Sequence, residues 1–373
     1  MRKTPIILLA SALPLAVQAA NTEFSYGGYI KLDAMVSQYS DGDLAAASSG
    51  RDFYQPSTIP TSNGGGDETN SVDFSAKTSR FNFKTVTTLD NGEKVTGFVE
   101  LDFLTTGQGN EVVSNSYAPR LRHAFFTYNN LTFGQTWSTF MNTGALPETV
   151  DFLGVSDGTV FNRQAQIRYT MGDFQFSLEN PETNVGGVGV TDDAKLPDIV
   201  ARYNLKSGDH SFAVAVIGRQ FAYQDGANID ETATGFGVSL SGKIQLGMDD
   251  LKFSYTTGDV ARYVGVGEAA DVIVKANGDL EATTVNAAFV AYRHFWTPQL
   301  RSTLAYSMLD ADYDDDTIAA GLNEKSSSSR INLMYSPAKE ITYGVEYSMA
   351  TLEKVNGNDG DLDRLQFTAK YSF

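Results

Sequence analysis

The chain has 373 residues and carries 28 Lys and Arg against 45 Asp and Glu, a formal net charge of −17. It contains no cysteine, which excludes disulfide scaffolds and thiolate metal sites. An acidic balance also argues against nucleic-acid binding, because phosphates are held by clustered Lys and Arg. The 23 Phe and 18 Tyr argue against disorder.

The N-terminus reads as a secretory signal peptide over residues 1–19. Arg2 and Lys3 precede an apolar run that extends from Ile6 to Val17, and small residues follow at positions suited to signal peptidase. The run is too short to cross about 30 Å of hydrocarbon. No stretch of 18 apolar residues follows it, so the exported domain, residues 20–373, is expected either to be soluble or to be a β-barrel.

The remainder of the chain alternates between apolar and polar residues, which predicts β-strands. At the C-terminus, one face would carry Leu365, Phe367, Ala369, Tyr371 and Phe373. The same alternation recurs within 80–84, 174–179, 303–308, 330–335 and 341–348. Alternation alone would also fit a soluble β-sandwich.

The connections separate these two possibilities, because short turns alternate with long polar loops. Short turns are predicted at 90–92, 129–130, 172, 207–209, 247–249, 297–298 and 337–338. Long loops are predicted near 38–71, 106–118, 139–161, 182–196, 224–231, 260–279, 311–325 and 353–360. Seven turns and eight loops connect sixteen antiparallel strands, with short periplasmic turns and long extracellular loops. This pattern is typical of an outer-membrane β-barrel wide enough for an aqueous channel.

The negative charge lies in the predicted loops. The eight long loops hold 25 acids and 6 cations, a net charge of −19. Without Arg2 and Lys3 the chain has 26 cations and 45 acids, so the strands and short turns hold the remaining 20 of each. The membrane span is therefore expected to be neutral overall.

Cations in the polar phase of the strands are predicted to line the lumen, because a charge on the lipid face would cost about 2–4 kcal/mol at the midplane. The predicted pore-lining residues are Arg80, Lys84, Arg120, Arg122, Arg168, Arg202, Arg330 and Arg364. Closure of the barrel would bring Arg80, Arg120, Arg122, Arg330 and Arg364 together on one wall. The alternative is that each arginine is a solvated lumen residue paired with a neighbouring acid.

The third long loop, 139–161, is a candidate constriction loop. It carries Glu148, Asp151 and Asp157 and no cation. If it folded inward opposite the arginine wall, a transverse field would cross the narrowest point, and walls of arginine favour anions in pores.

Enzymatic and metal sites find little support. His123, His210 and His294 are the only candidate imidazole bases, and no Ser–His–acid set is recognisable. The acidic run 310–316 lacks the glycine and the distal Glu of a calcium-binding loop, so it is expected to be a solvated surface loop. The alternative is a divalent-cation bridge from this run to lipopolysaccharide. We expect no enzyme activity, no metal and no cofactor.

Several stretches resemble the DcaP-like family of outer-membrane porins. They are residues 26–33 (YGGYIKLD), 79–84 (SRFNFK), 133–137 (FGQTW) and 163–169 (RQAQIRY), together with the terminal Phe373. The resemblance implies a homotrimer in the outer membrane of a Gram-negative bacterium, surrounded by lipid and lipopolysaccharide. It also implies passage of small anionic solutes, notably dicarboxylates, and recognition of Phe373 by the barrel-assembly machinery.

These observations favour a passive channel for small hydrophilic solutes that prefers anions. A general porin without preference is the first alternative. A barrel enzyme acting on lipid or peptide, and a structural or adhesive barrel whose loops carry the function, are the others.

Overall fold

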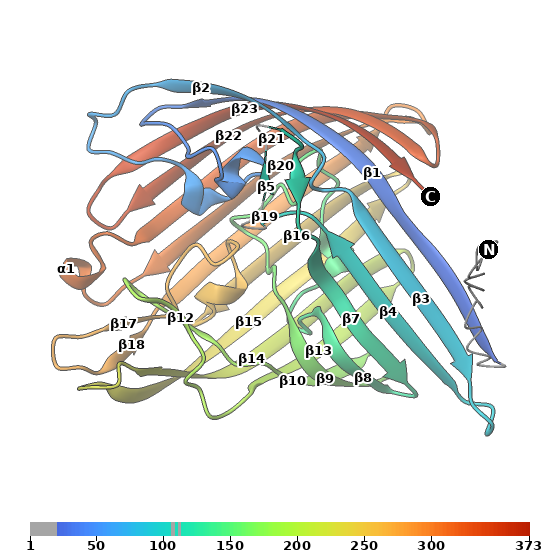
Figure 1. Ribbon diagram of the computed structural model, residues 1–373, viewed down its shortest axis with the longest axis horizontal. Coiled ribbons are helices and arrows are strands. Elements are labelled where there is room, and N and C mark those ends of the chain that lie inside the picture. The colour runs from blue at the N-terminus through green and yellow to red at the C-terminus, as the bar shows by residue number, and fades with distance from the viewer. Residues whose placement is uncertain (1–20, 106–108, 111–112) are drawn as a thin grey trace, which may run out of the picture.

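A computed structural model describes residues 21–105, 109–110 and 113–373, so the predicted signal peptide lies outside the described residues. One antiparallel sheet wraps into a barrel (Figure 1). Its strands are β1 (Thr22–Tyr39), β2 (Thr69–Ser75), β3 (Arg80–Thr88), β4 (Lys94–Asp102), β7 (Arg120–Tyr128), β8 (Leu131–Trp137), β9 (Arg163–Met171), β10 (Phe174–Glu179), β13 (Asp198–Ser207), β14 (His210–Gln224), β15 (Asp230–Leu246), β16 (Asp249–Gly258), β19 (Thr284–Phe295), β20 (Leu300–Asp312), β21 (Asn323–Ala338), β22 (Ile341–Lys354) and β23 (Asp359–Ser372).

The sheet closes because the first strand pairs with the last. β1 pairs with β23 from Tyr29 to Tyr39. On its other side, β1 pairs first with β3 and then with β2, so β2 and β3 are two halves of one strand, broken at residues 76–79. The 17 segments of the sheet therefore make 16 strands, which confirms the predicted fold class. Closure leaves no free seam facing lipid, where an unpaired backbone group would cost several kcal/mol.

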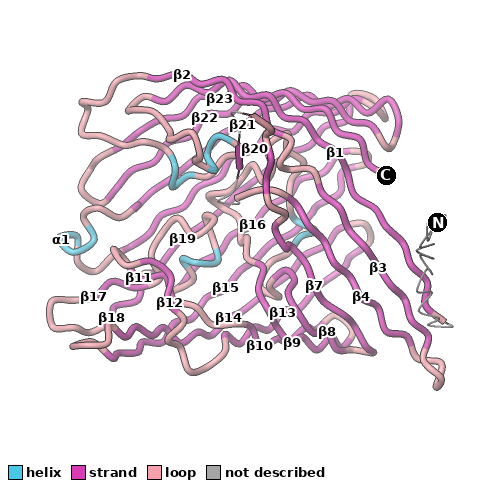
Figure 2. Tube along the Cα trace, viewed as in Figure 1, coloured by secondary structure: helices cyan, strands magenta, loops and turns pink. Residues whose placement is uncertain are grey.

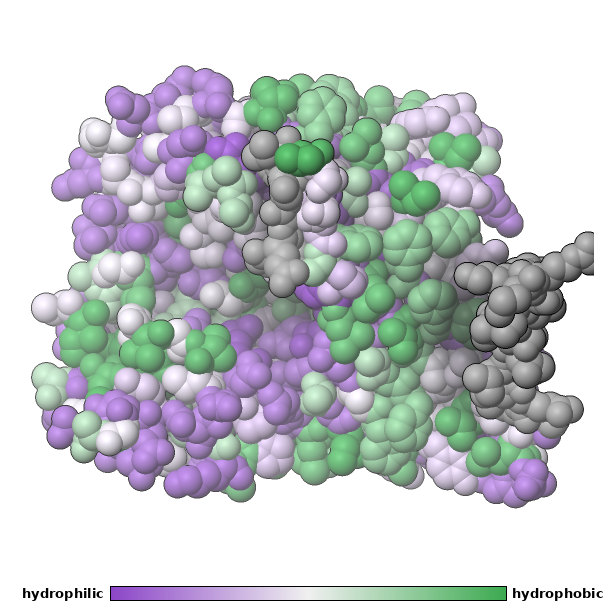
Figure 3. Space-filling view, viewed as in Figure 1, coloured by the Kyte–Doolittle hydropathy of each residue, from purple (hydrophilic) through white to green (hydrophobic). Residues whose placement is uncertain are grey.

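Side chains separate by the period of two along each strand. In β23, Leu365, Phe367 and Tyr371 face outward and are exposed, whereas Arg364, Gln366 and Thr368 face inward and are buried. The same division covers the barrel, so apolar residues dominate the outer surface over the middle of the strands (Figure 3). Hydrophilic residues gather at the end that carries the long loops.

The short turns form at one end of the barrel as predicted, at 89–93, 129–130, 172–173, 208–209, 247–248, 296–299 and 339–340. The connection near 337–338 lies slightly later in the chain than predicted, because β21 continues to Ala338 through a local register shift. Several connections at the opposite end are shorter than expected, and two of them contain only five and four residues. In these two, only residues 225–229 and 355–358 lie outside the strands, because β14, β15, β22 and β23 extend beyond the other strands.

The long loops contain little regular structure (Figure 2). Their short helices are η1 (Ser49–Arg51), η2 (Pro56–Thr58), η3 (Thr143–Ala145), η4 (Ala261–Tyr263) and α1 (Asp316–Ala319). Two small sheets join loop segments: β5 (Gly109–Asn110) with β6 (Ser116–Tyr117), and β11 (Thr183–Val185), β12 (Gly189–Thr191), β17 (Val272–Val274) and β18 (Leu280–Ala282). In the described part of the chain, no helix is long and apolar enough to traverse a bilayer.

The apolar core lies inside the barrel, where two loops fold inward against the wall. Phe140 and Val160 from loop 138–162, and Tyr263 from loop 259–283, pack against small inward-facing residues such as Ala215 and Ala287. A second cluster packs loop 40–68 against the ends of β1, β22 and β23. The interior is therefore occupied by loops that the wall positions.

Gly134 in β8 adopts a conformation that a side chain cannot share. Its φ is +118°, and a Cβ atom there would lie 2.3 Å from the carbonyl oxygen of Ala124. We therefore expect Gly134→Ala to destabilise the barrel by about 1–3 kcal/mol or more, because both backbone strain and a backbone clash oppose it. The temperature at which the folded barrel unfolds in heat-modifiability gels should fall by several degrees.

Gly321→Ala is the matched control, because no atom lies within 4 Å of a Cβ built there. An unchanged unfolding temperature in Gly134→Ala would contradict the expected strain.

Candidate functional site: the lumen and its inward loops

Loop 138–162 extends inside the barrel from the end of β8 to the wall formed by β16, β19 and β20. Glu148 is its main charged anchor. Its carboxylate binds Arg301 through two hydrogen bonds of 2.6 and 2.5 Å and Arg293 at 3.0 Å. Lys252 adds a hydrogen bond of 2.6 Å to the carbonyl of Leu146. The loop is thus fixed by side chains from three strands on the far wall.

The other two loop acids are also held by direct bonds. Asp157 accepts hydrogen bonds from Tyr54, Ser307 and Ser328. Asp151 accepts from the backbone N–H groups of Tyr54, Leu153 and Gly154. Both aspartates are buried. The predicted acids therefore anchor the loop and do not face an arginine wall across open space.

Two loop carboxyls have opposite pKa shifts. Burial opposes ionisation of Glu148, but the hydrogen bonds and charges of Arg301 and Arg293 prevail and lower its pKa. Burial and the charge of Asp157 raise the pKa of Glu268 well above its ordinary value. Glu268 accepts a hydrogen bond of 2.8 Å from Ser326. The anchor at Glu148 thus favours a carboxylate, whereas the Glu268 site favours the neutral acid.

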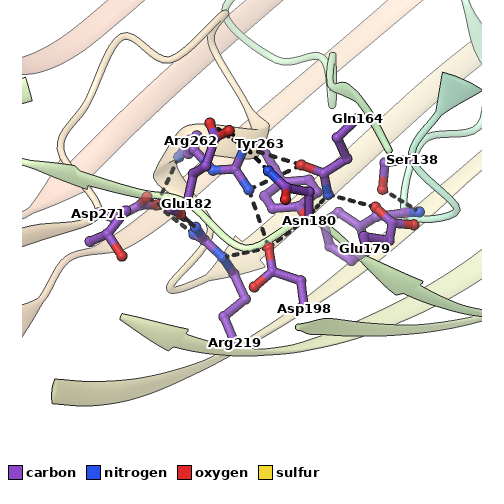
Figure 4. Close-up of polar contacts among 12 residues, drawn as sticks. Ser138, Gln164, Glu179, Asn180, Glu182, Asp198, Arg219, Arg262, Tyr263 and Asp271 are labelled. Atoms are coloured by element: carbon purple, nitrogen blue, oxygen red, sulfur yellow. Dashed lines mark hydrogen bonds and ion pairs between the residues drawn. The ribbon is translucent and has the colours of Figure 1, made fainter. Parts of the chain in front are cut away.

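Loop 259–283 is anchored on β13 and β14 by a buried polar network (Figure 4). Arg219 donates to both oxygens of Asp271 at 2.5 and 3.0 Å. Tyr263 donates to Asp198 at 2.7 Å, and Arg262 lies 3.2 Å from the same carboxylate. The phenol of Tyr263 also accepts from Gln164 of β9. This network secures a second segment inside the barrel.

Three of the predicted arginines do lie together, and a fourth joins them. We call Arg80, Arg120, Arg122 and Arg163 the arginine cluster. Arg122 lies 2.8 Å from both Glu100 and Asp102, Arg120 lies 2.8 Å from Asp102, and Arg80 lies 3.5 Å from Glu100. Four guanidinium groups and two carboxylates leave a formal charge of +2.

The arginine cluster contacts loop 138–162 through aromatic rings. Arg163 lies 5.5 Å from the ring centroid of Phe161 in the loop and 4.6 Å from that of Trp137, which ends β8 just before the loop. Arg122 lies 5.5 Å from the centroid of Phe152. Such contacts are worth about 0.5–2 kcal/mol each, so apolar faces of the loop cover this part of the cluster.

The remaining predicted cations have other surroundings. Arg330 bonds Glu346 at 3.3 Å, and Arg364 donates to Ser37, Tyr39 and the carbonyl of Gly50. The structure thus uses Arg364 to hold loop 40–68 and does not join these two residues to the arginine cluster by a bond. Arg168 and Arg202 donate to the carbonyls of Trp137 and Met141, and Lys84 is exposed on β3.

Several lumen cations were not predicted from the sequence, among them Arg163 and Lys31, whereas Lys370 shares the polar phase of the last strand. Arg163 directly follows the third long loop, so no alternating run precedes it. Lys31 and Lys370 each lie in an alternating run, and they are cross-strand partners at the closure of the barrel. The alternation in the sequence indicates which face of its strand each lysine occupies. Their proximity appears only once the register between the first and last strands is known.

Accessibility distinguishes the two signs of charge. In the described part of the chain, no ion pair joins Lys84, Arg163, Arg168, Arg202 or Lys370 to a carboxylate, and all five are partly or fully exposed. Acids without a cationic partner, such as Glu179, Asp157 and Glu268, are instead buried among neutral hydrogen-bond donors. Of these unpaired cations and unpaired acids, only the cations are accessible to a solute, so the accessible charge is positive.

The histidines have structural partners. His123 contacts Thr136 at 3.1 Å, and His210 accepts a hydrogen bond from the backbone of Gln245. His294 lies 2.8 Å from Asp249 and opposite Ser302 in the sheet, where the Ser302 hydroxyl accepts a hydrogen bond from Trp296. Within the described residues, no group of three or more His, Asp or Glu is arranged to hold a metal ion.

A closed sixteen-stranded barrel with an apolar outer surface and a polar interior defines the porin class of outer-membrane channels. The family model for the DcaP outer membrane protein matches residues 10–373, so the chain belongs to the DcaP family of the outer membrane.

Solved structures share the fold. The outer membrane channel DcaP of Acinetobacter baumannii superposes with a TM-score of 0.79 and 26% identity, covering 95% of this chain and 98% of that one. The anion-selective porin from Comamonas acidovorans gives 0.57 and 11%, covering 94% and 100%. OmpF of Salmonella typhi, in complex with daunomycin, gives 0.56 and 11%, covering 95% and 98%. A search of curated proteins found no significant match.

Glu148 should control how firmly loop 138–162 is held. We expect Glu148→Gln to accelerate hydrogen–deuterium exchange in peptides covering 142–151 by about fivefold, because a partly exposed charge-assisted pair is worth about 1 kcal/mol. The exposed Glu353→Gln is the control. Equal exchange in all three proteins would exclude Glu148 as the anchor.

Proposed function

We propose that this outer-membrane channel passes small hydrophilic solutes passively and favours anions. Dicarboxylates are the solute class that the family resemblance implies. The observation that carries the proposal is the asymmetry of accessible charge: lumen cations without a carboxylate partner are partly or fully exposed, whereas lumen acids such as Glu179, Asp157 and Glu268, which lack a cationic partner, are buried. Accessible cations attract anions, and the guanidinium fork suits the two oxygens of a carboxylate.

Loop 138–162 is proposed as the constriction. It is anchored at Glu148 on one wall and covers the arginine cluster with Phe152 and Phe161 on another. A solute passing the loop would therefore meet a low-dielectric aromatic surface beside guanidinium groups, where electrostatic attraction is stronger than in bulk water.

The acidic extracellular loops do not oppose this preference strongly. Salt screens exposed charges beyond about 8–10 Å, so an exposed loop acid acts on a solute only when the two are close together. Selectivity is therefore set by the charges nearest to the solute at the narrow part of the lumen.

Ion selectivity tests the proposal directly. In planar bilayers under a salt gradient, the reversal potential of the wild-type channel should have the sign that anion preference requires. Arg163→Gln should reduce this preference, because it removes a lumen cation that no carboxylate neutralises in the described residues.

Lys195→Gln is the control, because it removes one positive charge from an exposed extracellular position. A general porin would give a reversal potential near zero for both proteins. A cation-selective wild type would contradict the proposal.

The assembly is proposed to be a homotrimer, as the family resemblance implies. The outer wall of β3, β4, β7 and β8 offers an apolar surface that includes Phe83, Phe126 and Phe133. We expect the mass of the detergent-solubilised protein, measured by light scattering and corrected for detergent, to be three times that of one chain. A monomeric mass would contradict the trimer without affecting the channel.

A further inference from the structure

A small cavity lies between loop 138–162 and the strands at the closure of the barrel. Its volume is about 140 Å³, enough for roughly four or five water molecules at about 30 Å³ each. Tyr29, Lys31, Thr342 and Lys370 line it from the strands, and residues 149–152 line it from the loop.

Two lysines enter this cavity from neighbouring strands. Lys31 and Lys370 are directly opposite each other in the pairing of β1 with β23. Lys31 is buried, donates to the carbonyl of Val150 at 2.7 Å, and lies 3.0 Å from Asp33. Its charge is therefore partly compensated, and its position is fixed by the loop.

Lys370 has no comparable acidic partner. Its ammonium group lies 5.7 Å from the ring centroid of Tyr29, and no described carboxylate lies within ion-pair distance of it. The charged groups around it include the cations Lys31, Arg80 and Arg301 and the carboxylate of Glu148, and Asp151 of the loop lines the same cavity. Glu148 is itself bound by Arg301 at 2.5 Å, so it does not compensate Lys370.

The cavity also adjoins the arginine cluster. The guanidinium of Arg80 lies 5.2 Å from the same Tyr29 ring that Lys370 approaches. Basic side chains thus extend from the arginine cluster to this cavity. An anionic solute that leaves the arginine cluster would next meet the cavity.

We propose that this cavity is an anion subsite that holds one small acidic group, a carboxylate, phosphate or sulfate, between Lys370 and Lys31. The subsite rests on the proposed anion preference and adds a defined binding position to it. It lies toward the short-turn end of the lumen, since Lys370 is close to the end of β23 and pairs with Thr342, which follows the 339–340 turn. An anion there would pause before it leaves the channel.

Single-channel recording with inorganic phosphate tests the subsite. Phosphate added on the short-turn side should interrupt the chloride current of the wild type in a concentration-dependent manner. Lys370→Gln should weaken this block by about five- to tenfold, because a charge-assisted contact in a partly buried site is lost. Lys370→Arg should retain the block within about twofold.

Lys339→Gln is the matched control, because it removes one positive charge at the same end of the barrel from a turn that lies outside the lumen. Acetate and sulfate should be tested beside phosphate. A loss common to all three anions assigns a general anion subsite, whereas a loss confined to one assigns the site to that anion.

Two results would overturn the subsite: no phosphate block in the wild type, or an equal block in the wild type and Lys370→Gln. The reversal potential separates this failure from failure of the proposed function. If the wild type prefers anions but Lys370→Gln leaves the block unchanged, only the subsite is excluded. If the wild type shows no anion preference, the proposed function is excluded as well.

Discussion

The need to pair every backbone N–H and C=O group away from water governs this structure. In hydrocarbon an unpaired backbone group has no alternative partner, so a sheet is tolerated only if it closes. Here closure depends on a single seam between β1 and β23, which pairs eleven consecutive residues of each strand. The tilt, the outward apolar face and the polar interior follow from that closure, and the lumen charges are positioned by it.

The interior shows how a wide barrel stabilises inward loops without a conventional core. Loops 138–162 and 259–283 contribute apolar side chains, but they are positioned by buried charges and hydroxyl groups from the wall. A buried ion pair gains little net stability over an apolar contact, whereas a pair deprived of one partner is costly. The network around Arg219 and Asp271 therefore specifies the loop position more than it adds stability.

The alternation of side chains made the barrel predictable, because lipid and water select opposite faces of every strand. Turn residues such as Asn91-Gly92 located one end well. The strand boundaries predicted at the long-loop end were less accurate. β14 and β15 continue past the level where neighbouring strands stop, and the alternation of side chains does not indicate where the lipid ends. The adjacency of β3, β4 and β7 explains why Arg80 and Arg122 share Glu100, and why Arg120 and Arg122 share Asp102.

The partners of the lumen charges were less predictable. The hydrogen bond from Arg364 to the carbonyl of Gly50 joins residues more than 300 positions apart, so no local sequence pattern predicts it. The negative charge of loop 138–162 was evident from the sequence. The alternation of side chains, however, does not reveal that Arg293 and Arg301 neutralise Glu148. Sequence patterns specify the face of a side chain, while the register and the loop path decide which charges remain available.

The terminal residue has a consequence for biogenesis. Phe373 exchanges two backbone hydrogen bonds with Gly28, at 3.2 and 3.1 Å, so the seam between the first and last strands extends to Phe373. The barrel can therefore close only after both β1 and β23 have been synthesised. Contacts between the two chain ends have very large sequence separation, which slows folding and prolongs the exposure of aggregation-prone strands.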